Sequence, residues 1–342
     1  MTPAAAPTPK RAALVYNPVK TDGAELRALV TTHSAHAGWA PPLLLETRVE
    51  DPGQGLTRWA LSEGATTMLV AGGDGTVRAV AEALDGTGVP LAIVPSGTGN
   101  LLARNLMLPL GSPEAMVAAA FQGDTVPVDI GIARLRRADG ATEEHAFVVM
   151  AGMGLDAAMI ANTSSELKRS VGWVAYVDGA ARSLIRAEPF RIVYHPDPRA
   201  DEGTIRTLTR LHSAKVHSIL VANCGSLPAG IALIPDASIV DGTLDVAIIQ
   251  PSGPFGWFGV WRKVWWDNSV LRRFRAGRRI VQRRKDSSIR FLRVAGIETA
   301  TPSPQPVELD GDQFGEAIRM NCTVHRGGLI AAVPRGHPTA AL

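Results

Sequence analysis

The sequence is poor in the residues that mark several large classes of protein. It has two cysteines, Cys224 and Cys322, in 342 residues, and their separation matches no metal-ligand spacing. This scarcity favours a reducing intracellular setting over a disulfide-stabilised secreted one. The eight histidines show no metal-binding spacing, and no Gly-x-Ser-x-Gly motif occurs. Neither a histidine-based metal site nor hydrolase chemistry is therefore indicated.

Long apolar runs are missing as well. No stretch approaches the roughly 20 uninterrupted apolar residues of a membrane-spanning helix. Residues 1–11 are rich in Pro, Ala and Thr, and we expect a loose tail there and no signal peptide. The net charge of +3 gives no general argument for nucleic-acid binding. What remains is a chain with 46% apolar residues, long enough for two domains, that is soluble or docks on a surface.

The first third of the chain alternates short apolar runs with amphipathic segments. The pattern predicts strands at 12–18, 42–47, 66–72 and 90–95, and helices at 22–36, 54–63, 76–84 and 98–106. Fully apolar strands that alternate with helices are typical of a parallel sheet covered on both faces. Ligands of such α/β domains gather at the carboxyl ends of the strands.

The pattern changes at about residue 126. Short strand-like runs separated by turns or polar loops then dominate, and only 164–186 reads as a sizeable helix. A run of strands after an α/β region predicts a second, mainly antiparallel β-sandwich domain. The fold class is therefore an N-terminal α/β domain with a mainly parallel sheet, followed by a β-sandwich.

A glycine-rich turn, GGDGT at 72–76, follows the third predicted strand and precedes a helix. Glycines let backbone N–H groups approach phosphate oxygens, and the helix N-terminus adds its dipole. No Lys-Ser or Lys-Thr pair follows, which excludes a Walker A loop. Asp74 suits a magnesium ion or the orientation of a hydroxyl nucleophile. The alternative is a tight strand-to-helix turn without a ligand.

Two more turns follow predicted strands. PSGTGN at 95–100 contains a second Gly-Thr-Gly-Asn turn, and YNPVK at 16–20 contributes Asn17 and Lys20. Together the three strand ends offer amide, hydroxyl and lysine groups that could surround a triphosphate. Lys20 taken alone is equally consistent with a solvated loop lysine.

These motifs together resemble the diacylglycerol kinase catalytic family, which also includes sphingosine kinases and bacterial lipid kinases. The matching stretches are NP (17–18), GGDGT (72–76), PSGTGN (95–100), VDIG (128–131), AGMGLDA (151–157), DGTLDVAI (241–248) and LDGD (309–312). They occur in the family's order and span about residues 12–333. GGDGT alone is a weak signal because NAD kinases carry similar turns, whereas DGTLDV with the late DGD is more specific.

The resemblance implies a nucleotide domain at 12–128, completed by a C-terminal strand at about 317–335, and a lipid-binding β-sandwich at 129–316. It implies ATP and Mg²⁺ as cofactors. The residues it places at the nucleotide are Asn17, Lys20, Gly72, Gly73, Gly75, Thr76, Ser96, Gly97, Thr98, Asn100 and Lys168. Lys20 and Lys168 match basic positions near the transferred phosphoryl group.

The resemblance also implies metal ligands and a catalytic base. Asp74 and Asp129 belong to its magnesium network, and Asp241 and Asp245 of DGTLD resemble a structural metal site with a backbone carbonyl as a further ligand. A simple Asp-Gly turn is the alternative for DGTLD. The late motif normally reads Asp-Gly-Glu, and its glutamate is the proposed base in bacterial members.

Here the late motif reads Asp-Gly-Asp, which makes Asp312 the leading base candidate and Asp74 the second. An Asp-Gly turn between strands is the alternative. Two further departures are Arg78-Ala79, where relatives often have Asn-Glu, and Leu101, where they often have Asp. The absence of a carboxylate at Leu101 removes one expected link between Asp74 and Asp129.

The segment 255–293 holds four of the seven tryptophans, and its basic residues far outnumber its acids. Trp and Phe beside Arg and Lys suit an anionic bilayer interface. Trp257, Phe258, Trp261 and Trp265 could share one helical face. The alternative is that the tryptophans pack on the sandwich. No nucleic-acid-binding module is recognisable.

The sequence thus predicts a cytoplasmic lipid kinase, peripheral at the inner membrane face, that transfers the γ-phosphoryl group of ATP to a lipid hydroxyl. Diacylglycerol is the default acceptor; another lipid, such as a sphingoid base, is an alternative. An NAD kinase, or a catalytically weak nucleotide- or lipid-binding regulator, stays open as well. Predicted edge strands are compatible with a homodimer, although no self-complementary patch is recognisable.

Overall fold

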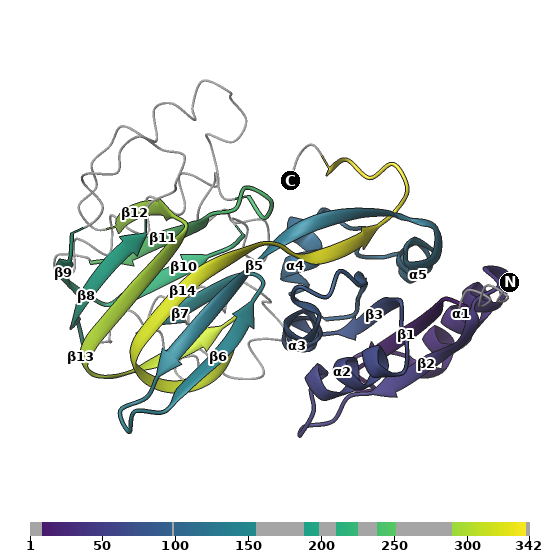
Figure 1. The fold of residues 1–342 in the computed structure, drawn as a ribbon, viewed down its shortest axis with the longest axis horizontal. Coiled ribbons are helices and arrows are strands. Elements are labelled where there is room, and N and C mark those ends of the chain that lie inside the picture. The colour runs from purple at the N-terminus through teal and green to yellow at the C-terminus, as the bar shows by residue number, and fades with distance from the viewer. Residues whose placement is uncertain are drawn as a thin grey trace, which may run out of the picture. The chain divides into compact units, whose positions relative to one another are not determined.

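The protein folds into two compact units (Figure 1). The computed structural model describes residues 9–97, 99–154, 188–197, 210–224, 238–250 and 289–339. The first unit comprises Met1–Asp129 and Arg326–Leu342, and the second comprises Ile130–His325. The two boundaries fall inside two strands, β5 (Asp124–Arg136) and β14 (Asp312–Val333), so the chain leaves the first unit and later returns to it.

The first unit is an α/β layer structure. Its strands are β1 (Arg11–Tyr16), β2 (Ala40–Glu46), β3 (Thr67–Gly72) and β4 (Pro90–Pro95), and its helices are α1 (Gly23–His36), α2 (Gln54–Ser62), α3 (Asp74–Leu84), α4 (Leu101–Asn105) and α5 (Pro113–Gln122). The sheet order is β14-β4-β3-β1-β2, and every neighbouring pair is parallel. All six residues of β3 are buried, as expected for an inner strand covered on both faces.

Helix starts in this unit follow from local chemistry. The Asp22 side chain accepts hydrogen bonds from the backbone N–H groups of Ala24 and Glu25 at the start of α1. Ser112 caps α5 in the same way, and Pro113 occupies its first turn. By contrast, α3 begins at Asp74 with no side-chain cap among the described residues. The glycine turn therefore leads directly into an uncapped helix N-terminus.

The second unit is rich in antiparallel strands. Its other strands are β6 (Thr142–Phe147), β7 (Met150–Met153), β8 (Phe190–Asp197), β9 (His212–Val216), β10 (Ser218–Ala222), β11 (Leu244–Ile249), β12 (Ile289–Val294) and β13 (Gly296–Leu309). One path runs β12-β11-β10-β7-β13-β14, and β8 with β9 extends from β13. The predicted fold class, an α/β domain followed by a mainly antiparallel β domain, is thereby confirmed.

One of the strand-like runs after residue 126 is divided in the structure. The run 209–224 reads as a single strand in the sequence, but its described part contains two strands, β9 and β10, with His217 between them. Strand β9 pairs with β8, whereas β10 pairs with β7 and β11. The backbone N–H of His217 donates to the carbonyl of Ile249 at 2.9 Å, so the chain changes pairing partners at this residue. The predicted helix 164–186 lies outside the described residues.

Candidate active site

Three strand ends lie side by side at one edge of the first unit's sheet. Tyr16 is opposite Ala71, and Gly72 is opposite Pro95, in the parallel register of β1, β3 and β4. The backbone N–H of Asn17 also donates to the carbonyl of Ala71 at 2.8 Å. The turns that follow these strands therefore begin at the same edge, which is where α/β domains bind their ligands.

The two glycine turns touch backbone to backbone. A Cβ atom built on Gly97 would lie 2.9 Å from the Cα atom of Gly73 and 3.3 Å from the carbonyl oxygen of Gly72. Glycine is therefore required at position 97 for steric reasons. Gly73 differs, because a Cβ built there has no neighbour within 4 Å among the described residues. Gly73 thus presents its backbone to open space at the start of α3.

Hydrogen bonds fix the second turn internally. Asn100 has a φ of 48°, in the left-handed region that asparagine tolerates. Its Oδ1 accepts from the N–H of Gly97 at 3.0 Å, and its Nδ2 donates to the carbonyl of Gly97 at 2.7 Å. Arg104 Nε also donates to the carbonyl of Gly99 at 2.7 Å. The turn is therefore ordered by its own side chains.

Asp74 joins the two turns. Its Oδ1 accepts a hydrogen bond from the backbone N–H of Leu101 at 2.6 Å, and a Cβ on Gly99 would lie 2.3 Å from its Oδ2. The link from Asp74 to position 101 is thus made through the main chain, although Leu101 carries no carboxylate. Asp129 is buried, and its Oδ1 accepts from the N–H of Gly327 at 2.8 Å within the same unit.

The turn that follows β1, at residues 16–20, is organised by Asn17. Its Oδ1 accepts from the N–H of Val19 at 3.0 Å, and its carbonyl accepts from the N–H of Lys20 at 3.1 Å. Lys20 is exposed, Thr76 is buried, and Gly75 and Ser96 are partly buried. The structure thus brings most of the predicted nucleotide residues to the ends of β1, β3 and β4. Thr98 and Lys168 lie outside the described residues.

The late Asp-Gly-Asp motif forms a two-residue β-hairpin turn in the second unit. Asp310 and Gly311 have φ values of 52° and 90°, and Leu309 of β13 is paired with Asp312 of β14. Positive φ at both central residues is the geometry for which Asp-Gly is favoured. Asp312 is exposed as the first residue of β14.

The Asp310 side chain is a buried structural anchor. Its carboxylate accepts three backbone hydrogen bonds, from Val148 at 2.8 Å, Val149 at 2.8 Å and Met150 at 2.9 Å. Its own N–H donates to the carbonyl of Met150 at 2.9 Å, and the residue is 5% exposed. The sequence does not reveal this role, because the partners lie about 160 positions earlier in the chain.

The bend at residues 148–150, whose N–H groups donate to Asp310, also accepts hydrogen bonds from residues that follow β10. The N–H groups of Asn223 and Cys224 donate to the carbonyl of Val149, and the Cys224 thiol donates to the carbonyl of Val148 at 3.0 Å. Burial, with a further contribution from the Asp310 carboxylate, raises the pKa of Cys224, so its thiol stays protonated. The hairpin tip is therefore anchored in a buried hydrogen-bonded network.

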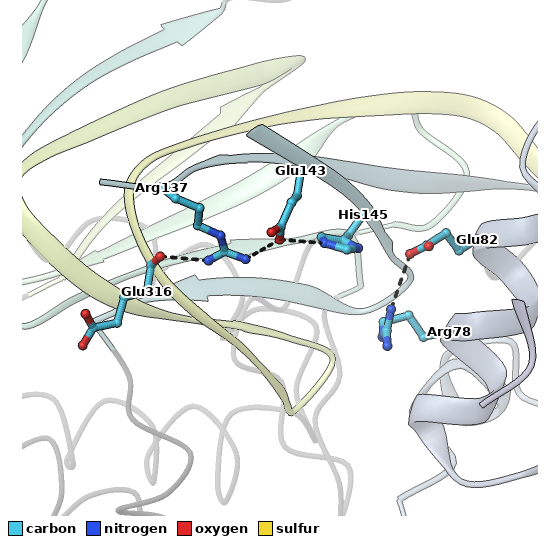
Figure 2. A network of polar contacts seen from close by, with 6 residues as sticks. All are labelled: Arg78, Glu82, Arg137, Glu143, His145 and Glu316. Carbon is cyan, nitrogen blue, oxygen red and sulfur yellow. Dashed lines mark hydrogen bonds and ion pairs between the residues drawn. The ribbon is translucent and has the colours of Figure 1, made fainter. Parts of the chain in front are cut away.

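A second set of contacts, made by Arg137, Glu143 and His145, fixes the first residues of β14 (Figure 2). Arg137 donates to Glu143 at 2.5 Å and to the carbonyl of Glu316 at 2.9 Å, and His145 lies 3.5 Å from Glu143. Arg137, and then His145, lowers the pKa of Glu143. The His145 ring also packs on Phe314, with ring centroids 4.7 Å apart. These contacts fix the strand on which Asp312 lies.

Arg78 is one of the residues at which the sequence departs from the pattern that the family resemblance implies. It is 4% exposed and forms an ion pair with Glu82 at 3.4 Å, one turn further along α3 (Figure 2). A buried arginine needs such a partner, because an uncompensated buried charge is costly. Ala79 is completely buried against the unit's core. Arg78 and Ala79 therefore both contribute to the packing of α3.

The predicted metal ligands differ in their surroundings. Mg²⁺ in kinases is usually held by one or two carboxylates together with substrate phosphates, and Asp74 at the glycine turns fits that pattern. Asp241 and Asp245 instead face Arg293, whose Nε lies 3.2 Å from Asp245 and whose Nη1 lies 4.0 Å from Asp241. A guanidinium in contact with both carboxylates does not fit a divalent cation at the same place. In the described part of the chain, no group of three or more His, Cys, Asp or Glu side chains could hold a metal ion alone.

Sequence comparison decides the family. Residues 11–133 match the model of the diacylglycerol kinase catalytic domain, and residues 148–323 match that of the YegS C-terminal NAD kinase beta sandwich-like domain. The chain belongs to the diacylglycerol kinase catalytic family of lipid kinases.

Relatives of this family cover most of the chain. A probable lipid kinase YegS-like from Pseudomonas aeruginosa is 30% identical over 82% of this chain and 80% of its own length. A diacylglycerol kinase of Mycobacterium tuberculosis is 31% identical over 56% of this chain. That match spans 57% of the relative's own length.

The fold is shared with a solved structure. The crystal structure of a diacylglycerol kinase from Bacillus anthracis superposes with a TM-score of 0.68 and covers 98% of this chain and all of that one. Identity between the two is 19%, so the likeness shows the fold. None of the helices within the described ranges is long and apolar enough to cross a membrane.

Proposed function

We propose that this lipid kinase family member transfers the γ-phosphoryl group of ATP to the hydroxyl group of diacylglycerol. The observation that carries the proposal is the contact between the two glycine turns at the ends of β3 and β4, beside an uncapped helix N-terminus. Such an edge suits a polyphosphate because amide N–H groups and the helix dipole both favour negative charge.

In the proposed complex, the nucleotide binds at the ends of β1, β3 and β4. Backbone groups of Gly72, Gly73, Gly75 and Gly97 lie closest to the phosphates, and Asn17, Thr76, Ser96, Thr98 and Asn100 line the remaining site. Lys20 and Lys168 are proposed to neutralise charge at the transferred group. Kinases depend on this kind of positioning and charge compensation, because the chain itself forms no covalent intermediate.

Asp74 is the residue proposed to hold Mg²⁺ with the nucleotide, and Asp129 to support it. When bound, the ion would neutralise charge on the β- and γ-phosphates. Asp74 is well prepared for this role because the N–H of Leu101 fixes one of its oxygens. Its carboxylate then keeps a single orientation beside both glycine turns.

Asp312 is the proposed general base. It would accept the proton of the lipid hydroxyl while that oxygen forms its bond to the γ-phosphorus and the bond from the γ-phosphorus to the leaving ADP oxygen breaks. The hairpin turn and the Asp310 anchor present this carboxylate at a fixed position within the second unit. Asp310 is therefore proposed as a positioning residue for Asp312.

A membrane-facing role of the stretch 255–293 accounts for access to a lipid. Only Ile289–Arg293 of this stretch is described, as part of β12, where Phe291 is 39% exposed beside the exposed Arg290. Residues 255–288 lie outside the described ranges. We propose attachment to the anionic inner face of the membrane, because each basic residue near such a surface contributes about 1 kcal/mol. Homodimer formation stays a prediction.

One assay tests the proposed function. The full chain is incubated with labelled ATP, Mg²⁺ and vesicles of anionic phospholipid that contain diacylglycerol, monoacylglycerol, a sphingoid base or a polyprenol. Label in phosphatidic acid is the expected result. Label in another lipid changes the acceptor, label in NADP from added NAD shows an NAD kinase, and nucleotide binding without turnover shows a regulator.

Two glycine variants test the nucleotide site. Gly73→Ala is expected to melt as the native protein does, because its methyl group meets no neighbour, and to weaken ATP binding about tenfold by blocking close approach of phosphate. Gly97→Ala is expected to lower the stability by about 1–3 kcal/mol, because its methyl group meets the backbone of Gly73. Calorimetric melting and ATP titration separate the two effects. Unchanged ATP affinity in Gly73→Ala would remove this turn from the site.

A further inference from the structure

The DGTLD turn carries two carboxylates that converge on one arginine. Asp245 is the second residue of β11, and Arg293 is directly opposite it on the antiparallel strand β12. The Nε of Arg293 lies 3.2 Å from Oδ1 of Asp245, and its Nη1 lies 4.0 Å from Oδ2 of Asp241. One guanidinium therefore contacts both acids of the motif.

The second oxygen of Asp241 is also engaged by donors. Its Oδ1 accepts from the backbone N–H of Thr243 at 2.9 Å and from the Thr243 hydroxyl. Thr243 is 1% exposed and Asp245 is 6% exposed, whereas the side chains of Asp241 and Arg293 are partly exposed, at 25% and 36%, so Asp245 is the carboxylate that is shielded from water. Carboxylates in such surroundings need positive charge or donors close by.

Arginine supplies that charge permanently. The guanidinium does not lose its proton in proteins, and its planar array of N–H groups can serve two acceptors at once. A divalent cation bound to the same two carboxylates would be only a few ångströms from this fixed positive charge and would be repelled. Directly opposed residues of opposite charge also stabilise an antiparallel strand pair.

We infer that Arg293 supplies, from within the chain, the positive charge that the family resemblance assigns to a structural divalent cation at DGTLD. The second unit then needs no divalent cation at this turn. This assignment does not depend on the proposed phosphoryl transfer.

The position of the contact between Arg293 and Asp245 indicates a structural role. Strands β11 and β12 pair without a register shift from Leu244 opposite Val294 to Ile249 opposite Ile289. The segment 250–288 connects the two strands; it begins after Ile249 and ends before Ile289, and these two residues are opposite each other. Arg293 contacts Asp245 near the other end of the strand pair. The guanidinium thus fixes the register of a hairpin whose connection is 39 residues long.

The test measures melting and bound metal, and needs no turnover. Every protein in the test carries Asp74→Asn, which excludes a response from the proposed nucleotide site, and the protein with this change alone is the native background. The native background, Arg293→Met, Arg293→Lys, Asp241→Asn and Arg293→Met with Asp241→Asn are dialysed against chelator and melted without nucleotide. Mg²⁺ or Ca²⁺ is then added, with KCl of equal ionic strength as the control for screening.

We expect the native background to melt at the same temperature with chelator and with either metal. Arg293→Met is expected to melt about 3–6 °C lower in chelator, and added metal should restore this loss saturably. The double variant should not respond, because Asp241 no longer carries a charge. Arg293→Lys, which keeps the charge, is expected to stay insensitive to metal.

Two results would overturn the inference. One is a saturable rise in the melting temperature of the native background with Mg²⁺ or Ca²⁺ that Asp241→Asn removes. The other is an Arg293→Met variant that melts like the native background in chelator. If Arg293→Met does not fold, elemental analysis of the dialysed native background decides. No retained divalent metal supports the inference, and one equivalent that Asp241→Asn loses contradicts it.

Discussion

Asp312→Asn is expected to abolish phosphoryl transfer and to leave ATP affinity and melting temperature unchanged. Asparagine cannot accept the proton of the acceptor hydroxyl, and a positioned general base contributes about 10²–10⁴-fold to a rate. The melting temperature should not change, because Asp312 is exposed at the end of the hairpin. Turnover with saturating ATP and lipid, ATP titration and thermal melting give the three readouts.

Two matched variants sharpen this prediction. Asp312→Glu restores the residue that the family motif normally carries, and it is expected to retain turnover. Asp74→Asn is expected to weaken nucleotide binding as well as turnover, because Asp74 is proposed to hold Mg²⁺ beside the phosphates. Full turnover in Asp312→Asn would exclude Asp312 as the base and make Asp74 the remaining candidate.

Asp310→Asn is expected to lower both the stability and the turnover number. The carboxylate accepts three backbone N–H bonds, and the amide group of asparagine would turn a donor toward one of those donors. Loss of a buried hydrogen bond to a charged group costs about 2–3 kcal/mol, which corresponds to a fall in melting temperature of about 4–10 °C. The turnover number should fall because the hairpin tip that carries Asp312 loses its anchor.

Asparagine at position 310 separates the effect of losing the buried carboxylate from any effect on turn formation. Asn-Gly is at least as favourable as Asp-Gly at two central residues with positive φ, so a loss cannot be attributed to turn formation. Gly311→Ala is the complementary variant, because it strains the turn at a φ of 90° and leaves the carboxylate in place. Turnover of Asp310→Asn is measured well below its melting temperature, with KM for ATP as the control. An unchanged turnover number would reduce Asp310 to a purely structural residue.

The sequence predicts the α/β unit well for a clear physical reason. Its inner strands β3 and β4 consist almost entirely of buried apolar residues, because both faces are covered, and glycines and a Thr or Asn mark the turns that follow them. Periodicity therefore indicates both the elements and the sheet edge at which the candidate site lies. The contact between the two glycine turns could not be predicted, because the hydrogen bond to Asp74 comes from the main-chain N–H of Leu101, a group that any residue except proline supplies.

The second unit shows the limits of pattern reading. Strand β13 includes Pro302, Pro304 and Pro306, residues that usually argue against a strand interior, and its pairing with β14 shifts register around them. The anchoring role of Asp310 depends on a bend about 160 residues away, and that of Arg293 on a strand partner 48 residues away. Local sequence contains no signal for such distant partners.

The return of β14 to the first unit has a consequence for dissecting this protein. Residues Ile330–Ala332 of β14 pair with Pro90–Ala92 of β4 and so form the last parallel pair of the sheet, and β14 also pairs with β5. A fragment ending at Asp129 would lack β14 and would leave one edge of β4 with unpaired backbone N–H and C=O groups, which promote aggregation. An autonomous N-terminal fragment would have to carry the C-terminal segment from Arg326 through a designed linker.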